Sequence, residues 1–276
     1  MIIDGKKIRS EILEGVKNGV MNLPFSPVFC DILVGDDPVS AQYVRMKGKT
    51  AESVGIKFRE ATFPDSITTE DLISEIDNLN NVPHMCGIIV QLPLPPHIDR
   101  QAVLDAIKPS LDVDCLGSEA SAKFYDNNNP IGFPTALACM QVLDSTGVEL
   151  KGKNIVVLGR GNLVGKPVAH LLEARGLPVT VVHRETEHPE DIIKNADVII
   201  SGIGKGKFIT GEKIKTGAII VDAGTSEDSG GVVGDVDLPS VENVASFVSP
   251  TPGGVGPVTV AILLRNVLET AKVVYE

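Results

Sequence analysis

Two kinds of hydrophobic pattern alternate along the first part of the chain. Near-continuous apolar runs at 28–35 and 86–96 predict buried strands, and 56–64 predicts a further strand. Between them, apolar residues recur every three or four positions and predict helices over 38–55 and 68–81. Strands that alternate with helices in this way predict a parallel sheet.

Short polar signals mark the ends of several predicted helices. Asp4 can accept hydrogen bonds from the first free N–H groups of an N-terminal helix. Thr69 begins the helix over 68–81 with a capping sequence, and Gly55 suits the C-terminal end of the helix over 38–55. These signals support the predicted boundaries of three helices.

The alternation of strands and helices restarts after a polar, turn-rich stretch at 118–130, which predicts a linker or boundary loop. The last element, over 256–274, is apolar nearly all round, which indicates a buried helix that can return to the first domain. In the region between these two segments, strands and helices are predicted at 154–159, 165–176, 178–183, 188–196, 197–204 and 218–224.

The composition suits a globular chain with more than one core. The chain has 276 residues, of which 43% are hydrophobic, enough for two domains. Its formal net charge of −11 repels phosphate backbones, so we do not expect a nucleic-acid partner. No apolar stretch has the length needed to cross a bilayer and the N-terminus lacks a signal-peptide core, so we expect a cytoplasmic protein without a membrane partner.

The four cysteines lack the spacing of a metal site. Cys30, Cys86, Cys115 and Cys139 are far apart, and no C-x-x-C motif occurs. Four reduced and mostly buried thiols are therefore expected rather than a disulfide framework, and no metal is predicted.

Three glycines indicate a nucleotide site in the second half of the chain. Gly159, Gly161 and Gly165 lie between a predicted strand and a predicted helix. Glycine allows a tight turn and a close approach of the backbone to a pyrophosphate, whose charge the helix N-terminus favours. The alternative is a tight turn that binds no ligand.

Two arginines bear on which nicotinamide cofactor is bound. Arg160 lies inside the glycine turn, and Arg184 lies at the end of the next predicted strand. Guanidinium groups near the ribose suit the extra phosphate of NADP. If Glu185 points inward instead, NAD becomes plausible, because an acid at this place accepts hydrogen bonds from the ribose hydroxyls. Arg184 can also be an ordinary solvated charge.

The helix over 38–55 presents Ser40, Tyr43 and Lys47 on one side, because their spacings of three and four match the helical turn. A buried lysine can lose its proton and act as a base, and a tyrosine ring can stack on a flat ligand. The alternative is an ordinary amphipathic surface.

Further polar and glycine-rich positions fall at the ends of predicted elements. Gln91 lies at the carboxyl end of a parallel strand, where α/β proteins form ligand sites. Asp112 and Asp114 are two positions apart, and Gly253 and Gly254 precede the last helix. Glycines there allow a ligand to approach the backbone.

Six segments, taken in order, resemble a known family. They are YVRMKGKTAESVGI, VQLPLP, LDVD, GR-x-x-x-VGKP, GDVD and PTPGGVGPVT. In this order they resemble the bifunctional methylenetetrahydrofolate dehydrogenase/methenyltetrahydrofolate cyclohydrolase family over nearly the whole chain. The combination of Y-V-x-x-K with P-G-G-V-G-P carries most of this resemblance.

The resemblance implies an α/β fold of two domains with a folate site between them. Residues 1–125 with 257–276 would form the catalytic, folate-binding domain, and 126–256 a Rossmann-like NAD(P)-binding domain. The implied function is NADP-dependent oxidation of methylenetetrahydrofolate and hydrolysis of the product to formyltetrahydrofolate. The implied context is one-carbon metabolism and purine biosynthesis, in a homodimer.

The resemblance also implies roles for individual residues. Lys47 would be the catalytic lysine of the hydrolysis, with Gln91 hydrogen-bonded near it. Tyr43 would stack on the pterin, Ser40 would support the site, and Asp114 would accept hydrogen bonds from the pterin's amino and ring N–H groups. The residues expected to line the folate with backbone are Gly253 and Gly254, and those expected to hold the cofactor are Gly159, Arg160, Gly161, Gly165, Arg184 and Thr225.

The chain departs from the family pattern at three places. Cys115 follows the LDVD segment where the family usually has glycine, and Gly161 replaces a serine. Residues 133–136 read FPTA instead of PCTP, so only Thr135 is kept. These changes leave the predicted catalytic residues in place and can alter cofactor choice or the ratio of the two activities.

Two other functions fit parts of the sequence. A dehydrogenase of another small substrate, such as a shikimate-type hydroxy acid, would share the fold, but the N-terminal motifs favour folate. A nucleotide-sensing module without catalysis would explain the glycine turn, yet it would leave the Ser40, Tyr43 and Lys47 side of the helix unused. An assay with methylenetetrahydrofolate distinguishes these possibilities.

Overall fold

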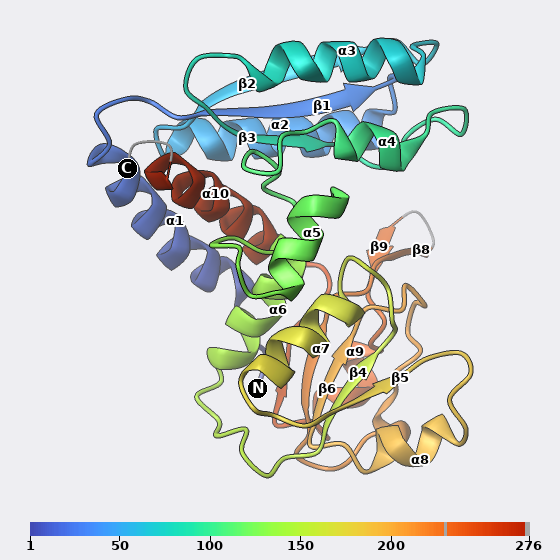
Figure 1. Cartoon of the computed structure of the whole chain (residues 1–276). Coiled ribbons are helices and arrows are strands. Elements are labelled where there is room, and N and C mark those ends of the chain that lie inside the picture. The colour runs from blue at the N-terminus through green and yellow to red at the C-terminus, as the bar shows by residue number, and fades with distance from the viewer. Residues whose placement is uncertain (229–230, 274–276) are drawn as a thin grey trace. The chain divides into compact units, whose positions relative to one another are not determined.

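The computed structural model describes residues 1–228 and 231–273 (Figure 1). The chain forms two compact units. The five-stranded unit comprises Met1–Ser10 and Thr135–Ile262, and the three-stranded unit comprises Glu11–Pro134 and the chain from Leu263 onward. Helices α1 (Gly5–Met21) and α10 (Val255–Val273) each begin in the first of these units and end in the second.

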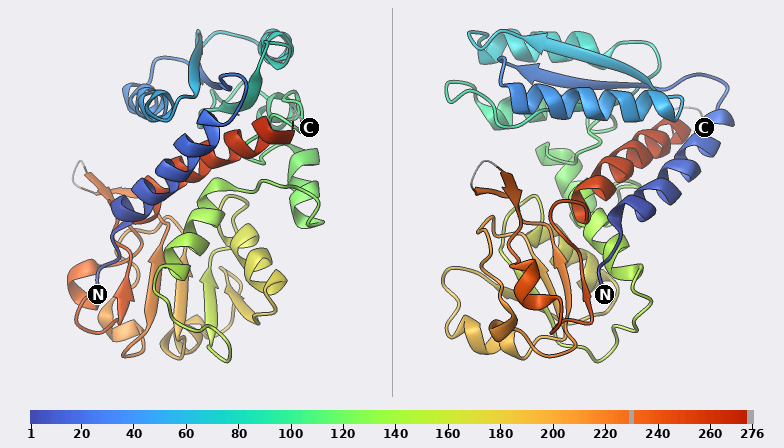
Figure 2. Two further views of the ribbon diagram at one scale, coloured as in Figure 1. Left: turned by 90° about the vertical axis from the view of Figure 1, so that its left-hand side faces the viewer. Right: turned by 180° about the vertical axis from the view of Figure 1, so that it is seen from behind.

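The three-stranded unit is built on a parallel sheet of order β2-β1-β3. Helices α2 and α3 lie on opposite faces of this sheet (Figures 1 and 2). The strands are β1 (Val28–Val34), β2 (Lys57–Phe63) and β3 (Met85–Val90), and the helices between and after them are α2 (Pro38–Ser53), α3 (Thr69–Asn80), α4 (Arg100–Asp105) and α5 (Ser118–Tyr125). The strands and helices predicted for 28–96 are therefore confirmed.

Alternation along β1 divides its side chains between the two faces. Cys30, Ile32 and Val34 pack with α3 and α4 in one apolar core. Phe29 and Asp31 point to the other face, where Phe29 contacts the ring of Phe58 and α2 covers the sheet. This alternation places the one acidic residue of β1 beneath α2.

The capping residue predicted for α3, Thr69, is wrong by one position. The capping residue is Thr68, whose side-chain oxygen accepts a hydrogen bond of 3.1 Å from the backbone N–H of Asp71. Thr69 is instead the first helical residue, and its hydroxyl accepts a hydrogen bond from the N–H of Asp99. Two adjacent threonines make either position a chemically acceptable cap, so sequence alone does not distinguish them.

The linker predicted at 118–130 is also wrong, because Ser118–Tyr125 form helix α5. The N–H and hydroxyl of Ser118 both donate to the carboxylate of Asp105, which holds the start of the helix. Its apolar side consists of little more than Ala120 and Phe124, which are buried. Phe124 packs edge-on against Phe133 at a centroid distance of 5.0 Å.

The five-stranded unit contains a parallel sheet of order β10-β7-β6-β4-β5. The strands and helices predicted between 154 and 224 are confirmed, and the elements at 134–144, 238–241 and 247–248 were not predicted. The strands are β4 (Ile155–Leu158), β5 (Val179–Val182), β6 (Val198–Ser201), β7 (Ile219–Asp222) and β10 (Phe247–Val248), and the helices are α6 (Pro134–Asp144), α7 (Gly165–Ala174), α8 (Pro189–Lys194) and α9 (Leu238–Val241). A short 3₁₀ turn and a hairpin complete the unit: Gly211–Lys213, and β8 (Ser226–Asp228) with β9 (Gly231–Val233).

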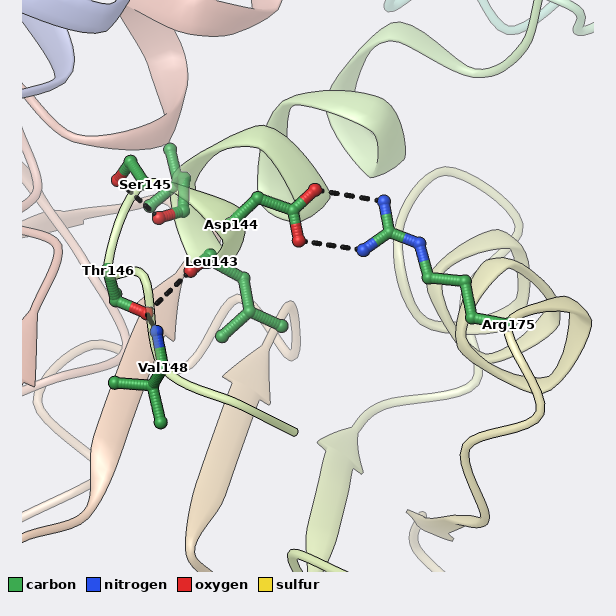
Figure 3. Close-up of polar contacts among 7 residues, drawn as sticks. Leu143, Asp144, Ser145, Thr146, Val148 and Arg175 are labelled. Carbon is green, nitrogen blue, oxygen red and sulfur yellow. Dashed lines mark hydrogen bonds and ion pairs between the residues drawn. The ribbon is translucent and has the colours of Figure 1, made fainter. Parts of the chain in front are cut away.

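The end of α6 is joined to the end of α7 by an ion pair (Figure 3). Arg175 donates from Nη1 and Nη2 to the two carboxylate oxygens of Asp144, at 2.7 and 2.9 Å. Both side chains are 43% exposed, so the pair contributes little to stability. The last turn of α6 is closed by the hydroxyls of Ser145 and Thr146, which donate to backbone carbonyls one turn earlier.

The N-terminal backbone pairs with β10. The N–H of Ile3 donates to the carbonyl of Val248 at 2.9 Å, and the N–H of Val248 donates to the carbonyl of Met1 at 3.0 Å. Asp4 caps α1, as predicted, by accepting from the N–H groups of Lys6 and Lys7. The predicted end of the last helix, residue 274, lies outside the described residues.

Three further observations concern the cysteines, the length of the helices and possible metal ligands. All four cysteines are free and buried, as expected. Among the described residues, every helix is too short or too polar to span a bilayer. Within 1–228 and 231–273, no group of three or more His, Cys, Asp or Glu side chains is arranged to hold a metal ion.

Candidate functional site

Lys47 lies at the centre of a buried polar group in the three-stranded unit. It belongs to the side of α2 that faces the sheet, and its side chain is only 11% exposed. Its Nζ lies 2.6 Å from Oδ2 of Asp31 and 2.8 Å from Oε1 of Gln91. The amine therefore points into the unit, toward one acceptor in β1 and one directly after the end of β3.

Gln91 is held in one orientation by the backbone around it. Its N–H donates to the carbonyl of Ile32 at 2.8 Å, which continues the pairing of β3 with β1 beyond the end of the strand. Its side-chain Nε2 donates to the carbonyl of Leu92 at 2.8 Å, so Oε1 is turned toward Lys47. The structure therefore brings together two residues that lie 44 positions apart in the sequence.

Sequence reasoning missed Asp31, the ion-pair partner of Lys47. Its side chain is fully buried, and burial raises the pKa of its carboxyl to about 6, against the opposing charge of Lys47. The available signal was an acid in the middle of the apolar run VFCDILV. An acid at such a place is expected to be paired, because an isolated charge is costly to bury.

The other two predicted residues of α2 differ in exposure. Ser40 is buried, and its backbone N–H donates to the capping carboxylate of Asp37 at 2.7 Å. Tyr43 is 47% exposed. Its ring is therefore available to stack on a flat ligand at the surface of this unit, next to the buried Lys47 on the same side of the helix.

The segment after β3 carries two aspartates with different roles. Asp112 is buried and accepts hydrogen bonds from the backbone N–H groups of Gly117 and Asp114, at 2.7 and 3.2 Å. Burial raises the pKa of its carboxyl to about 7, although these N–H groups favour the charged form. Asp112 therefore shapes the loop, and Asp114 is the half-buried acid that the loop presents.

Asp114 is electrostatically connected to Lys47. Burial raises the pKa of the Asp114 carboxyl, and the charge of Lys47 opposes that shift. The next residue, Cys115, has a left-handed backbone with φ of 58°. This explains why glycine suits this position and shows that the departure from glycine does not prevent the loop from forming.

A groove of about 840 Å³ lies at the carboxyl ends of the strands in the five-stranded unit. Four of the predicted cofactor residues line it, Gly159, Arg160, Gly161 and Arg184, with Lys205 on the loop after β6. A parallel sheet binds nucleotides at this edge. The volume, the glycine turn and the three basic side chains fit a dinucleotide.

The glycine turn allows a very close packing of strand and helix. Gly159 has a φ of +100°, and a Cβ on Gly165 would lie 2.1 Å from the carbonyl oxygen of Gly159. Any side chain at Gly165 would therefore push the start of α7 away from the turn. Gly165 supports the groove without lining it, and the exposed Thr225 does not line it either.

Gly253 and Gly254 precede α10 in the five-stranded unit. Gly253 has a φ of +107°, which a residue with a side chain adopts only under strain. A Cβ on Gly254 would lie 2.5 Å from the carbonyl oxygen of Pro250. The bend before α10 thus requires both glycines for its own shape.

Two buried acids that carried no predicted role hold the loops beside the groove. Asp235, of the GDVD segment, accepts from the hydroxyl of Ser201 and from the N–H groups of Ile203 and Lys205, at 2.7 to 2.8 Å. Asp222 accepts from the N–H of Asp235 at 3.1 Å. The available signal for Asp235 was the GDVD motif itself, in which this acid binds the hydroxyl and backbone N–H groups of the loop after β6.

Two family models match the chain. The model described as tetrahydrofolate dehydrogenase/cyclohydrolase, catalytic domain, matches residues 3–114. The model described as tetrahydrofolate dehydrogenase/cyclohydrolase, NAD(P)-binding domain, matches residues 134–275. Together they cover most of the chain, and each falls largely on one half of the sequence.

Individual relatives agree with these matches. The bifunctional protein FolD of Halothermothrix orenii is 42% identical over 276 residues, covering 98% of each chain. The bifunctional FolD structure from Campylobacter jejuni matches with a TM-score of 0.93 at 36% identity, covering 99% of this chain and 98% of that one. The Trypanosoma brucei structure, a complex with NADP cofactor and inhibitor, matches with a TM-score of 0.93 at 37% identity, covering 100% and 98%.

Proposed function

Because the chain belongs to the tetrahydrofolate dehydrogenase/cyclohydrolase family, we propose a specific division of its two reactions between the residues described above. The chain is a bifunctional methylenetetrahydrofolate dehydrogenase and methenyltetrahydrofolate cyclohydrolase. A dehydrogenase of another substrate and a non-catalytic nucleotide sensor are not favoured, since the catalytic-domain model matches as well as the nucleotide-binding one.

The five-stranded unit binds the nicotinamide cofactor in this proposal. The glycine turn at Gly159 and Gly161 approaches the pyrophosphate, and the N-terminus of α7 favours its charge. A nicotinamide ring held there would supply the acceptor for a hydride from the methylene carbon of the substrate. The protein contributes binding and orientation to this step, because the two nitrogens next to that carbon stabilise the resulting cation.

Arg160 and Arg184 favour NADP over NAD. Both are exposed at the groove, beside the carboxyl ends of β4 and β5. Planar guanidinium groups bind a phosphate with paired hydrogen bonds, which the unphosphorylated ribose of NAD cannot form. The NADP bound in the Trypanosoma brucei relative supports the same preference.

The cofactor preference is tested by the Arg184→Ser variant. Loss of a charged hydrogen bond costs about 1.5–3 kcal/mol, so the KM for NADP should rise by roughly tenfold or more while the KM for NAD stays nearly constant. Arg175→Ser is the matched control, because Arg175 belongs to the same unit but pairs with Asp144 away from the groove. Equal effects of Arg184→Ser on both cofactors would contradict the assignment.

The three-stranded unit supplies the folate-binding side chains in this proposal. Asp114 accepts hydrogen bonds from the amino and ring N–H groups of the pterin, and the exposed ring of Tyr43 stacks on it. Ser40 supports the start of α2. We further propose that Gly253 and Gly254 present backbone to the folate, and that the domain boundaries follow 1–125 with 257–276 and 126–256.

Lys47 carries the hydrolysis of the methenyl product. Water must lose a proton as it adds to the methenyl carbon, and a ring nitrogen must gain one as the ring opens, so the step needs a group that moves protons. The observation that supports Lys47 is its inward amine, held at 2.8 Å from Gln91 and 2.6 Å from Asp31 in the interior of the unit.

The Lys47→Met variant tests this role. Hydrolysis of added methenyltetrahydrofolate, followed by its absorbance, should fall by roughly 100-fold or more. Reduction of NADP with methylenetetrahydrofolate should persist, because hydride transfer needs no protein acid or base. Lys49→Met is the control on the same helix, since Lys49 is exposed and its loss should change neither rate. Hydrolysis near the wild-type rate in Lys47→Met would refute the assignment.

We propose in addition that the chain acts as a cytoplasmic homodimer in one-carbon metabolism, where its formyl product serves purine biosynthesis. The support is the similarity to bacterial bifunctional proteins over the full length of the chain. Sedimentation equilibrium of the purified chain measures the oligomeric state directly.

A further inference from the structure

Strand β1 contains one charged residue among apolar neighbours. Asp31 lies in the middle of the strand, between Cys30 and Ile32, and all three side chains are fully buried. The strand pairs with a neighbour on both sides, so a carboxylate here is remote from bulk water. Burying a charge at such a place is costly unless a partner compensates it.

Among the residues that the structure describes, the only partner of the Asp31 carboxylate is Lys47. Oδ2 lies 2.6 Å from the Lys47 amine, and Oδ1 has no hydrogen-bond donor among the described residues. Asp112, which is also buried, instead accepts two backbone N–H groups and shapes a loop. Asp31 has no such structural task, so its contact with the amine is what it contributes.

The surrounding charges make this pair sensitive to protonation. The charged groups that act on Asp31 are Lys47 from α2, Asp114 from the segment after β3 and Glu60 from β2, while its chain neighbour Cys30 points to the opposite face of the sheet. Burial raises the pKa of Asp31 to about 6; the charge and hydrogen bond of Lys47 oppose this, and the carboxylates of Asp114 and Glu60 add to it. One cation is therefore shared between two buried or half-buried acids.

We propose that Asp31 is a positioning residue of the hydrolysis, which holds the Lys47 amine in place and sets its state of charge. The inference rests on the proposed role of Lys47. A carboxylate at ion-pair distance favours the ammonium form over the neutral amine. When the proton passes from Nζ of Lys47 to Oδ2 of Asp31, an N–H bond breaks, an O–H bond forms and the pair becomes neutral. The free amine can then take a proton from the attacking water.

Hydride transfer does not depend on this pair, because it moves no proton through the protein. The two activities of the chain should therefore respond differently to a change at Asp31. This difference separates an effect on Lys47 from a general loss of folded protein, which would lower both activities together.

The Asp31→Asn variant tests the proposal, because the amide keeps the size and an acceptor for Lys47 but removes the charge. The rate of enzymatic hydrolysis of methenyltetrahydrofolate is measured against pH, after subtraction of the uncatalysed rate. Without the carboxylate, the ammonium form is disfavoured, so the limb of the profile that depends on Lys47 should move by about one pH unit or more toward lower pH. NADP reduction with methylenetetrahydrofolate should keep its wild-type rate.

Glu60→Gln is the matched control. Glu60 pairs in register with Asp31 on the neighbouring strand, is exposed, and loses the same single charge on substitution. Glu60 is the weakest of the charges that act on Asp31 and forms no ion pair with Lys47 among the described residues, so its profile should move by much less than that of Asp31→Asn. A second variant, Asp31→Val, matches the apolar neighbours of β1 and should move the profile in the same direction as Asp31→Asn.

Three outcomes overturn the proposal. They are an unchanged pH profile in Asp31→Asn, an equal fall of both activities, or a failure of both Asp31 variants to fold, which would make the residue structural. The proposed role of Lys47 fails separately: it is wrong if Lys47→Met still hydrolyses, whatever Asp31→Asn shows. If Lys47→Met loses hydrolysis while the profile of Asp31→Asn is unchanged, only the inference about Asp31 is lost.

Discussion

Cys115 has a backbone conformation that side chains normally disfavour. Its φ of 58° lies in the left-handed region, and its side chain is fully buried behind the loop that presents Asp114. In this region a Cβ approaches the following carbonyl oxygen, at a cost of roughly 1–2 kcal/mol relative to glycine. Sγ is 3.8 Å from Nδ2 of Asn129, a weak contact that offsets little of this cost.

We therefore expect Cys115→Gly to be more stable than Cys115→Ala by roughly 1 kcal/mol. Both variants lose the same Sγ contacts, so the difference between them isolates the strain of the Cβ. The free energy of unfolding, from denaturant titrations of the two variants side by side, measures it.

Cys139 supplies the control for this comparison. It is also fully buried, but it lies within the helix α6. In a helix interior glycine costs about 1 kcal/mol relative to alanine, so Cys139→Gly should be the less stable member of its pair. The same order of stability at both positions would show that the backbone at Cys115 is not strained.

At the scale of single residues, the site was only partly predictable. The roles proposed for Lys47, Gln91 and Asp114 come from the family resemblance. The spacing of Ser40, Tyr43 and Lys47 is by itself equally typical of an amphipathic surface. Asp31 was missed, because the reading of β1 as an apolar run gave no weight to its one acid. Its importance depends on which face of the sheet it occupies, and only the pairing of the strands decides that.

At the scale of elements, the strands and helices predicted within 28–96 and 154–224 are correct, whereas helices α4, α5 and α6 were not predicted. Length alone does not explain the difference, because α6 has 11 residues and the correctly predicted α8 has only six. In α5 the apolar side is formed by Ala120 and Phe124, among polar neighbours typical of a loop. The helix is stable because Asp105 binds its first turn and Phe133 packs on Phe124, contacts that no local pattern reveals.

At the scale of the whole chain, sequence order and compact units do not coincide. The first ten residues belong to the five-stranded unit, because the N-terminal backbone pairs with β10, nearly the whole length of the chain away. Likewise Asn266 of α10 donates to the carbonyls of Val113 and Gly132 in the three-stranded unit. Pairings of this range follow from tertiary packing, and the composition of the linkers carries no information about them.

The chain also buries several of its acids, although its net charge is −11. Burial raises the pKa of Asp31 and Asp222 to about 6 and that of Asp112 to about 7, from the usual value of 3.8. Between about pH 4 and pH 7 the folded chain therefore binds protons that the unfolded chain has released. The stabilisation from these groups is fully present below pH 4 and is lost as the pH rises through 6 to 7.

Asp112 and Asp105 provide a test of this pH dependence. They accept hydrogen bonds from the adjacent N–H groups of Gly117 and Ser118, but their pKa values are shifted in opposite directions. Partial burial would raise the pKa of Asp105, but hydrogen bonds from Ser118 and Gln101 outweigh it and hold that pKa below its usual range. Each bound proton changes stability by on the order of 1 kcal/mol per pH unit. In thermal unfolding from pH 3 to pH 8, Asp112→Asn should flatten the fall in stability between pH 4 and 7. Asp105→Asn should keep that fall and instead lessen the loss of stability below pH 4.

An amide at Asp112 disrupts one hydrogen bond at every pH. The comparison between the variants therefore uses the slope of the unfolding midpoint against pH, and not the midpoint itself. Parallel slopes for wild type and Asp112→Asn would mean that this carboxyl is ionised throughout the range despite its burial.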